Sequence, residues 1–378
     1  MKILIAIDSF KGSMTSMEAG NAAEKGIKRC MPDAEVKIMP VADGGEGTVQ
    51  ALVSGLDGQI HNVTVKNPIG EDIIATYGTF GKTAVIEMSA AAGITLIDKS
   101  ELNPIVATTY GVGQIIADAI NKGYRDFIVG IGGSATNDGG VGMLQALGFE
   151  FYDKEGKHVP FGARGLGKIA KICDDKVIPE VFECTFNIAC DVTNPLLGEN
   201  GCSTIYGPQK GASKKDIEIM EQGMKNYALV ASEKYKKADV NFPGAGAAGG
   251  MGFAFMTFLN GKLKSGIDLI LEKTEIEKYI KDADLVITGE GKIDGQTVMG
   301  KVPVGIARLA KKYGKTVIAF CGCATKDASA LNNHGIDGIF PILRTVCTLE
   351  EAMNTRNAME NLSNTAQQII NFYKEVIK

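Results

Sequence analysis

Five short apolar segments, two near the N-terminus and three near the C-terminus, limit most strongly what this chain can fold into. They are residues Lys2–Ile7, Val36–Met39, Leu285–Thr288, Thr316–Cys321 and Gly338–Ile342. Continuous apolar runs of this length are typical of parallel strands that are buried on both faces. Helical patterns follow these segments, so the two ends of the chain together predict a doubly wound α/β sheet.

The middle of the chain has a different pattern. Three strand segments separated by short turns predict an antiparallel arrangement: Gln59–Lys66, Ile73–Phe80 and Thr83–Met88. With 378 residues, the chain is also too long for one ordinary core. We therefore expect two different α/β domains. Residues 1–60 and 265–378 would form a flavodoxin-like doubly wound parallel sheet, and residues 61–264 a mixed α/β insertion domain.

The order of the outer strands determines where a ligand would bind. In the flavodoxin-like order the first strand lies beside the third, and ligands bind beyond the carboxyl ends of the strands at that point. The loops after these two strands carry residues that would then be neighbours: Asp8, Ser9, Lys11, Gly289, Glu290 and Asp294. We expect the inserted domain to contribute residues 132–138 and 191–194 across a cleft.

Composition and charge exclude several classes of partner. The net charge is −4 and no long basic or acidic run occurs, which argues against nucleic acid or an anionic membrane as the main partner. No apolar run reaches the ~18 residues of a membrane span. The first apolar run is too short for a signal peptide and ends at Asp8. Eight scattered cysteines fit a reducing compartment, so we expect a cytoplasmic protein with a small-molecule substrate; its oligomeric state is not predicted.

The titratable residues indicate which chemistry the chain can perform. Its three histidines, His61, His158 and His334, are isolated among polar or turn residues. A Ser/His/Asp or Cys/His mechanism is therefore not expected. Carboxylates and lysines must carry the chemistry instead.

The segment Gly130-Ile-Gly-Gly-Ser-Ala-Thr-Asn-Asp-Gly-Gly140 is the most informative glycine-rich loop. It follows an apolar strand and precedes a helical pattern. Glycines allow backbone amides to approach a ligand, and a helix N-terminus favours an anion. Five of its eleven residues are glycine, more than a tight turn requires. We interpret this loop as a phosphate or nucleotide contact.

Two other glycine spacings match known motifs only formally. Gly244, Gly246 and Gly249 have the G-x-G-x-x-G spacing of a dinucleotide fingerprint, but the residues before them are not a buried strand. Residues 295–301 have the spacing of a P-loop, but Val302 stands where Ser or Thr should bind Mg²⁺. We reject the P-loop and interpret the first motif as a substrate-facing or flexible loop.

Six segments, in order along the chain, resemble those of bacterial glycerate kinases of the first type. They are Asp8-Ser-Phe-Lys-Gly-Ser13, Pro40-Val-Ala-Asp-Gly-Gly-Glu-Gly-Thr48, Gly130–Gly140, Cys190-Asp-Val-Thr-Asn-Pro-Leu-Leu-Gly198, Gly207-Pro-Gln-Lys-Gly211 and Ile287-Thr-Gly-Glu-Gly-Lys-Ile-Asp-Gly-Gln-Thr297. The resemblance extends from the first strand to the last. It implies ATP-dependent phosphorylation of D-glycerate with Mg²⁺, usually to 2-phosphoglycerate, by a two-domain α/β protein.

Phosphoryl transfer depends on positioning and charge neutralisation, and this selects the candidate residues. Our catalytic candidates are Lys11, Asp191 and Asp294. The nucleotide or phosphate candidates are Gly132, Gly133, Ser134, Thr136, Asn137, Gly289 and Glu290. The substrate candidates are Asp8, Ser9, Lys11 and Lys292, and the Mg²⁺ candidates are Asp294 and Asp138. The residues leave open which carboxylate is the general base and which binds the metal; we favour Asp191 as base and Asp294 as metal ligand.

Two other classes of function stay open at this point. A nicotinamide-dependent oxidoreductase of small hydroxy acids would use the glycines at 244–249. A non-catalytic two-lobed binding protein would bind a small acid without a nucleotide. The carboxylates within the glycine-rich loops favour the kinase, because phosphoryl transfer needs both kinds of group together.

Overall fold

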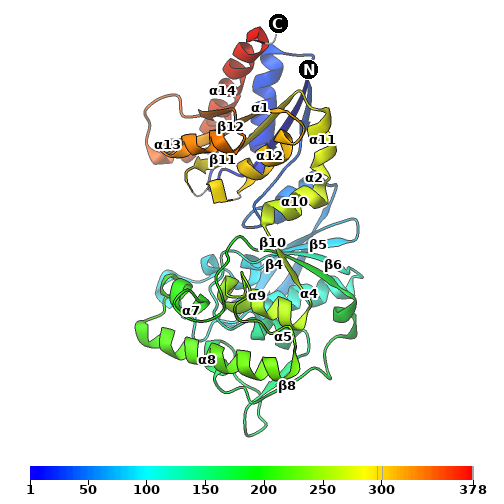
Figure 1. Ribbon diagram of the computed structural model, residues 1–378, viewed down its shortest axis with the longest axis vertical. Helices are drawn as coiled ribbons and strands as arrows, with labels where there is room; N and C mark the ends of the chain where they lie inside the picture. The colour runs from blue at the N-terminus through cyan, green and yellow to red at the C-terminus, as the bar shows by residue number, and fades with distance from the viewer. Residues whose placement is uncertain (296, 300, 377–378) are drawn as a thin grey trace. The chain divides into compact units, whose positions relative to one another are not determined.

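The computed structural model describes residues 1–295, 297–299 and 301–376. The chain forms two compact units. Unit 1 comprises residues 1–43, 50–57 and 267–378, and unit 2 comprises residues 44–49 and 58–266. The cleft expected between the two domains stays a prediction. Figure 1 shows that unit 1 contains both ends of the chain.

Unit 1 is built on a five-stranded sheet in the order β13-β12-β11-β1-β2. All neighbouring strands are parallel. The strands are β1 (Lys2–Ile7), β2 (Glu35–Ile38), β11 (Leu285–Ile293), β12 (Thr316–Ala324) and β13 (Gly338–Pro341). Because β1 lies between β2 and β11, the order is the flavodoxin-like order expected from the sequence. The prediction of a doubly wound parallel sheet is therefore confirmed.

Helices cover both faces of this sheet. On one face, α1 (Ser16–Cys30) and α14 (Thr355–Val376) pack against β1 and β11 in a single core cluster. On the other face, α12 (Val302–Lys311) and α11 (Ile276–Asp282) pack against the same strands. Helix α13 (Leu349–Met353) and most of α2 (Thr48–Gly55) and α10 (Gly266–Thr274) also belong to unit 1.

Glycine at position 26 permits the close approach of α1 to α14. A Cβ atom at Gly26 would lie 2.0 Å from the carbonyl oxygen of Ser363 in α14. That distance is far inside van der Waals contact, so any other residue would push the two helices apart. Helix α1 itself begins at a capping box, in which Thr15 accepts a hydrogen bond from the amide of Glu18 and the Glu18 side chain accepts one from the amide of Thr15.

Unit 2 is built on a six-stranded mixed sheet in the order β10-β9-β6-β5-β4-β3. Its strands are β3 (Gln59–Lys66), β4 (Asp72–Phe80), β5 (Thr83–Glu87), β6 (Asp126–Gly130), β9 (Thr185–Ala189) and β10 (Lys262–Lys264). The first three strands pair antiparallel, as expected, and the other neighbours pair parallel. The expectation of a mixed α/β domain is confirmed.

The helices of unit 2 and a small two-stranded sheet complete its core. The longer helices are α4 (Tyr110–Asn121), α8 (Lys214–Lys234) and α9 (Ala247–Phe258), and the shorter ones are α3 (Ser89–Ala92), α5 (Val141–Ala146), α6 (Ala163–Leu166) and α7 (Cys202–Tyr206). Strands β7 (Glu150–Tyr152) and β8 (Lys171–Cys173) pair antiparallel. Outside this pair, Tyr152 forms an isolated antiparallel bridge with His158.

One difference from the sequence expectation affects the site. The segment from Gly289 was expected to be a loop, but β11 continues to Ile293. Gly289 pairs with both Ile7 and Phe320, and a Cβ atom there would lie 2.2 Å from the Phe320 carbonyl oxygen. This glycine therefore serves the close packing of strands. Gly289 is buried within the sheet, so it does not provide the phosphate contact that we expected of it.

Candidate functional site

A cavity of about 320 Å³ lies in unit 1 at the carboxyl ends of β1 and β11. Its polar wall is formed by Asp8, Ser9, Lys11, Asp43, Glu290, Lys292 and Lys301. The strand order places this cavity where ligands bind in open parallel sheets. The structure thus brings together the substrate candidates from the first strand and Glu290 from the third, as the sequence predicted.

Two carboxylates of the cavity, Asp8 and Glu290, are held out of water. The side chain of Asp8 is buried, with 4% exposure, and its Oδ1 accepts a hydrogen bond from the Ser9 amide at 2.6 Å. Burial and the nearby charges of Asp43 and Glu290 raise the pKa of Asp8 to about 7. Burial likewise raises the pKa of Glu290, although Thr297 and Lys301 oppose this effect. A carboxyl group with a pKa near 7 is suited to exchange protons at neutral pH.

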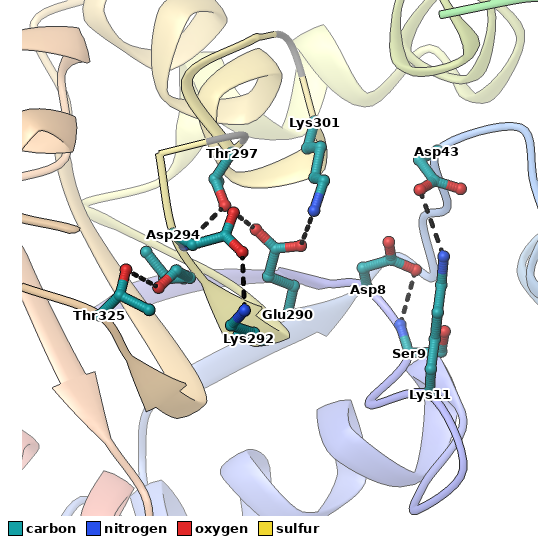
Figure 2. Close-up of polar contacts among 11 residues, drawn as sticks. Asp8, Ser9, Lys11, Asp43, Glu290, Lys292, Asp294, Thr297, Lys301 and Thr325 are labelled. Atoms are coloured by element: carbon teal, nitrogen blue, oxygen red, sulfur yellow. Dashed lines mark hydrogen bonds and ion pairs between the residues drawn. The ribbon is translucent and has the colours of Figure 1, made fainter. Parts of the chain in front are cut away.

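Three lysines of the same cavity pair with its carboxylates (Figure 2). Lys11 Nζ lies 3.6 Å from an oxygen of Asp43, Lys292 Nζ lies 3.1 Å from Asp294, and Lys301 Nζ lies 3.6 Å from Glu290. Lys11 and Lys292 are both 59% exposed in their side chains, so they can reach an incoming anion. The cavity therefore offers several cations to a small acid.

Asp294 is fixed by the turn that follows β11. Its backbone amide donates to the hydroxyl of Thr297 at 3.2 Å, and this hydroxyl in turn donates to Oε1 of Glu290 at 2.7 Å. Figure 2 shows these three residues as one chain of contacts. Gln296 of the same motif lies outside the described residues. The turn links two carboxylates that the sequence proposed for nucleotide and metal binding.

The other wall of the cavity is apolar. It includes Phe10 after β1, Ile342 after β13, and Leu349 and Met353 of α13. Leu349 is exposed, and Met353 is at the border of exposure, at 37%. No sequence pattern places these side chains in the same cavity as Asp8, because most of them come from the far end of the chain. A cavity with one charged wall and one apolar wall can accept a ligand that has both kinds of surface.

In unit 2, the Gly130–Gly140 loop turns most of its side chains inward. Thr136, Asn137 and Asp138 have no exposed surface, and Ser134 has 8%. Asn137 Nδ2 donates to the Ser203 hydroxyl at 2.9 Å. The side chains of Thr136 and Asn137 therefore do not reach solvent, which contradicts their expected contact with phosphate. Only the tip at Gly132 and Gly133 is exposed.

Asp138 also differs from its expected role as a metal ligand. Its carboxylate accepts hydrogen bonds from the amide and hydroxyl of Thr109 and from the amides of Gly140 and Gly142. Burial raises its pKa, and these hydrogen bonds act in the opposite direction. Four donors occupy the two oxygens of a fully buried group. Asp138 thus caps the start of α5 and fixes the loop, and this arrangement leaves it no access to Mg²⁺.

Asp191, the expected general base, lies at the end of β9 in unit 2. Its side chain is exposed, and Oδ1 accepts a hydrogen bond from the amide of Gly266 at 3.0 Å. Its carboxylate is more exposed than that of Asp8, which has 4% exposure. A catalytic role for Asp191 stays a prediction.

The glycines at 244–250 have a structural explanation. A Cβ atom at Gly246 would lie 2.1 Å from the Pro195 carbonyl oxygen, and one at Gly249 would lie 2.2 Å from that of Thr136. The Gly139 amide also donates to the Gly249 carbonyl at 2.9 Å. The two glycine-rich segments pack backbone against backbone. This packing accounts for the formal dinucleotide spacing, and no strand leads into it as that fingerprint requires.

Two further features of the described residues concern metal ions and membranes. Within residues 1–295, 297–299 and 301–376, no three His, Cys, Asp or Glu side chains are gathered closely enough to hold a metal ion. In the same part of the chain, no helix has both the length and the apolar character needed to cross a membrane.

Residues 3–374 match the glycerate kinase family. The chain belongs to this family. It is 45% identical over 371 residues to the glycerate 2-kinase of Escherichia coli, covering 98% of this chain and 97% of that protein. It is 45% identical over 359 residues to a glycerate kinase of Halalkalibacterium halodurans, covering 94% of each.

The fold also matches a solved structure. A crystal structure described as glycerate kinase 2 from Salmonella typhimurium superposes with a TM-score of 0.91. That protein is 41% identical, and the match covers 99% of this chain and 98% of the other. The similarity extends over both units, so membership of the glycerate kinase family rests on the whole chain rather than on one motif.

The sequence also offers Asp43 among its acidic candidates, and Lys210 and Lys301 among the lysines for the carboxylate of glycerate. Asp43 and Lys301 line the cavity of unit 1, and Lys210 is buried beneath the glycine-rich loop of unit 2. Two signals were available. Asp43 lies within the Pro40–Thr48 motif, and Lys210 lies within Gly207–Gly211, both of which resemble segments of the family. The burial that distinguishes Lys210 is not visible in its motif.

Proposed function

We propose that this protein is a kinase that transfers the γ-phosphoryl group of ATP to D-glycerate. The observation that carries the proposal is the cavity of unit 1, where a carboxyl group with a pKa near 7 lies among three cavity-lining lysines. Membership of the glycerate kinase family supports the choice of substrate. The cavity also has the size expected of a small-molecule site.

The lysines would bind the acid, and Asp8 would receive its proton. Glycerate is an anion, and the exposed ammonium groups of Lys11 and Lys292 can neutralise its carboxylate. Asp8 then accepts the proton of the attacking hydroxyl group, since its pKa lies close to neutral pH. This assigns the base to Asp8 in place of Asp191, because Asp8 is the buried carboxylate beside the substrate-binding lysines.

The exposed tip of the glycine-rich loop in unit 2 would contact phosphate oxygens. Among the described residues, the amides of Gly132 and Gly133 have no hydrogen-bond acceptor. Free amides on exposed glycines can approach an anion without interference from side chains.

Carboxylate oxygens are the donors that Mg²⁺ prefers, and the cavity provides them in Asp43 and Glu290, while Asp294 pairs with the cavity-lining Lys292. Mg²⁺ commonly keeps several waters and binds through one or two carboxylates plus substrate phosphates, which fits the lack of a preformed three-residue cluster. When bound, the ion would neutralise charge on the phosphates. The protein would hold it through these side chains, with Asp294 as our first candidate.

We propose 2-phosphoglycerate as the product and a place in the first type of the family. The name of the Escherichia coli relative, glycerate 2-kinase, supports this choice. The oxidoreductase alternative is not favoured, because its glycines are explained by packing and the family match is to kinases.

The test is ADP release by the purified protein with Mg-ATP, measured with and without D-glycerate. We expect ADP release that depends on D-glycerate and stops when EDTA is added. Reduction of NAD⁺ or NADP⁺ with D-glycerate, in the absence of ADP release, would establish the alternative instead.

A further inference from the structure

A lysine is buried beneath the glycine-rich loop of unit 2. Lys210 ends a short 3₁₀ turn, Pro208–Lys210, and has 1% exposure. Its Nζ donates to the hydroxyl of Ser134 at 2.8 Å and to the carbonyl oxygen of Thr136 at 2.6 Å. Two of its three donors are therefore bound to one loop. Lysine side chains are almost never fully buried unless they are paired.

The burial of Lys210 is costly, and the local charges only partly offset it. Burial lowers the pKa of Lys210 to about 8, while Cys202 and Asp138 act in the opposite direction. The ammonium group is mostly charged at pH 7, and the buried carboxylate of Asp138 belongs to the same loop. A buried charge tends to be a poor source of stability, but it can fix one arrangement of the groups around it.

The two buried charges fix different parts of the loop. Lys210 binds Ser134 and Thr136, in its first half, and Asp138 binds the amides that follow, at Gly140 and Gly142. Between these anchors the loop is buried. The exposed tip, Gly132 and Gly133, directly precedes the segment that Lys210 holds.

We propose that Lys210 is a positioning residue that holds Ser134 and Thr136 so that the amides of Gly132 and Gly133 are aimed at the phosphates of ATP. The inference rests on the proposed function, in which this tip contacts phosphate. Lys210 does not bind glycerate itself, because its ammonium group is buried and already donates to the loop. Its effect on ATP passes through the backbone.

Replacement of Lys210 by methionine tests this role. Lys210→Met keeps an unbranched side chain but removes both hydrogen bonds, each of which involves a charged group. We expect the KM for ATP to rise by about tenfold or more, with a much smaller change in the KM for D-glycerate. Lys214→Met, the same substitution at an exposed residue of α8, is the matched control and should behave like the wild type.

Two further measurements separate positioning from general damage. Amide hydrogen exchange should accelerate in the peptide spanning residues 131–137 of Lys210→Met, while the strands of unit 2 stay protected. Ser134→Ala removes one partner of Lys210 and should raise the KM for ATP by a few fold. The double variant should be no worse than Lys210→Met alone, because both changes break the same contact.

The outcomes distinguish this inference from the proposed function. If wild-type protein releases ADP with D-glycerate but Lys210→Met and Ser134→Ala bind ATP normally by calorimetry, the positioning role is wrong and the function stands. If Lys210→Met does not fold, unchanged ATP binding by Ser134→Ala still overturns the inference. If the wild type binds ATP but leaves D-glycerate unchanged, the function fails, and the calorimetric comparison of variants still tests Lys210.

Discussion

At the scale of the residue, the site depends on a carboxyl group whose ionisation is made unfavourable by its surroundings. Asp8 is buried next to two other acids, and its pKa is raised to about 7. A folded-state pKa above the unfolded value means that the folded protein loses stability as Asp8 ionises. Such a residue is maintained by function rather than by its contribution to the fold.

Asp8→Asn should therefore separate stability from activity. The stability that the wild type loses through Asp8 is small near pH 4, the ordinary carboxyl pKa. This loss grows as the pH rises and is complete above pH 7. We expect the variant to be more stable than the wild type by roughly 4 kcal/mol at pH 8, and by well under half of that at pH 5. Its kcat should fall by ~10²–10⁴-fold.

Denaturant unfolding at the two pH values, together with ADP-release kinetics, measures both effects. Asp43→Asn is the comparison at a less buried carboxylate of the same cavity, with 19% side-chain exposure. A stability gain that does not depend on pH would show that folding does not raise the pKa of Asp8. Retention of full activity would remove Asp8 from the mechanism.

At the scale of the element, glycine has different structural roles, and sequence patterns do not distinguish them. In β11 and at positions 246–250, glycine permits backbones to pack closely. At the tip of the Gly130–Gly140 loop, glycine leaves amides open to solvent. A count of glycines predicted that this loop was special, but only the neighbouring atoms show which glycines are available to a ligand.

Gly132→Ala tests the tip without disturbing the loop. The nearest atom to a Cβ there is 3.8 Å away, the Cα of Gly45, and the backbone is not left-handed. The fold should tolerate the methyl group, with unfolding free energy within ~0.5 kcal/mol of the wild type. ATP binding should weaken by about tenfold, because the methyl group hinders the approach of a phosphate to the amide, at a cost near that of one hydrogen bond to a charged group.

Isothermal calorimetry with ATP measures this effect. Gly167→Ala is the matched control, because that glycine is also exposed, has helical φ and ψ, and would place its Cβ no closer than 3.7 Å to a neighbour. Equal ATP affinity for the two variants would count against a phosphate contact at the tip.

The contact between α1 and α14 gives a second prediction at this scale. Gly26→Ala should destabilise unit 1 by ~1–3 kcal/mol, because its Cβ would lie 2.0 Å from the Ser363 carbonyl oxygen. In a solvent-exposed helix the same change is stabilising by ~0.5–1 kcal/mol. The sign of the change in unfolding free energy therefore shows whether α14 lies against this position. Lys25→Ala, at the exposed neighbouring position, should change thermal stability little. A stabilised Gly26→Ala would show that the helices separate freely.

At the scale of the whole molecule, the sequence predicted the sheet of unit 1 and its strand order. Buried parallel strands are continuous apolar runs, and few topologies connect them. The inward direction of Thr136 and Asn137 could not be predicted, because it depends on Ser203 and Lys210, which are distant in the sequence. The apolar wall of the cavity was missed for the same reason, since α13 follows Asp8 by more than three hundred residues.

The transfer of phosphate between two identified molecules tests the central claim most directly. Protein is incubated with Mg²⁺, D-glycerate and ATP labelled in its γ-phosphoryl group, and the products are identified by phosphorus NMR. We predict that the label appears in 2-phosphoglycerate with the wild type, is lost from that product with EDTA, and is nearly absent with Asp8→Asn. Label that remains in ATP, or appears only as inorganic phosphate, would contradict the account.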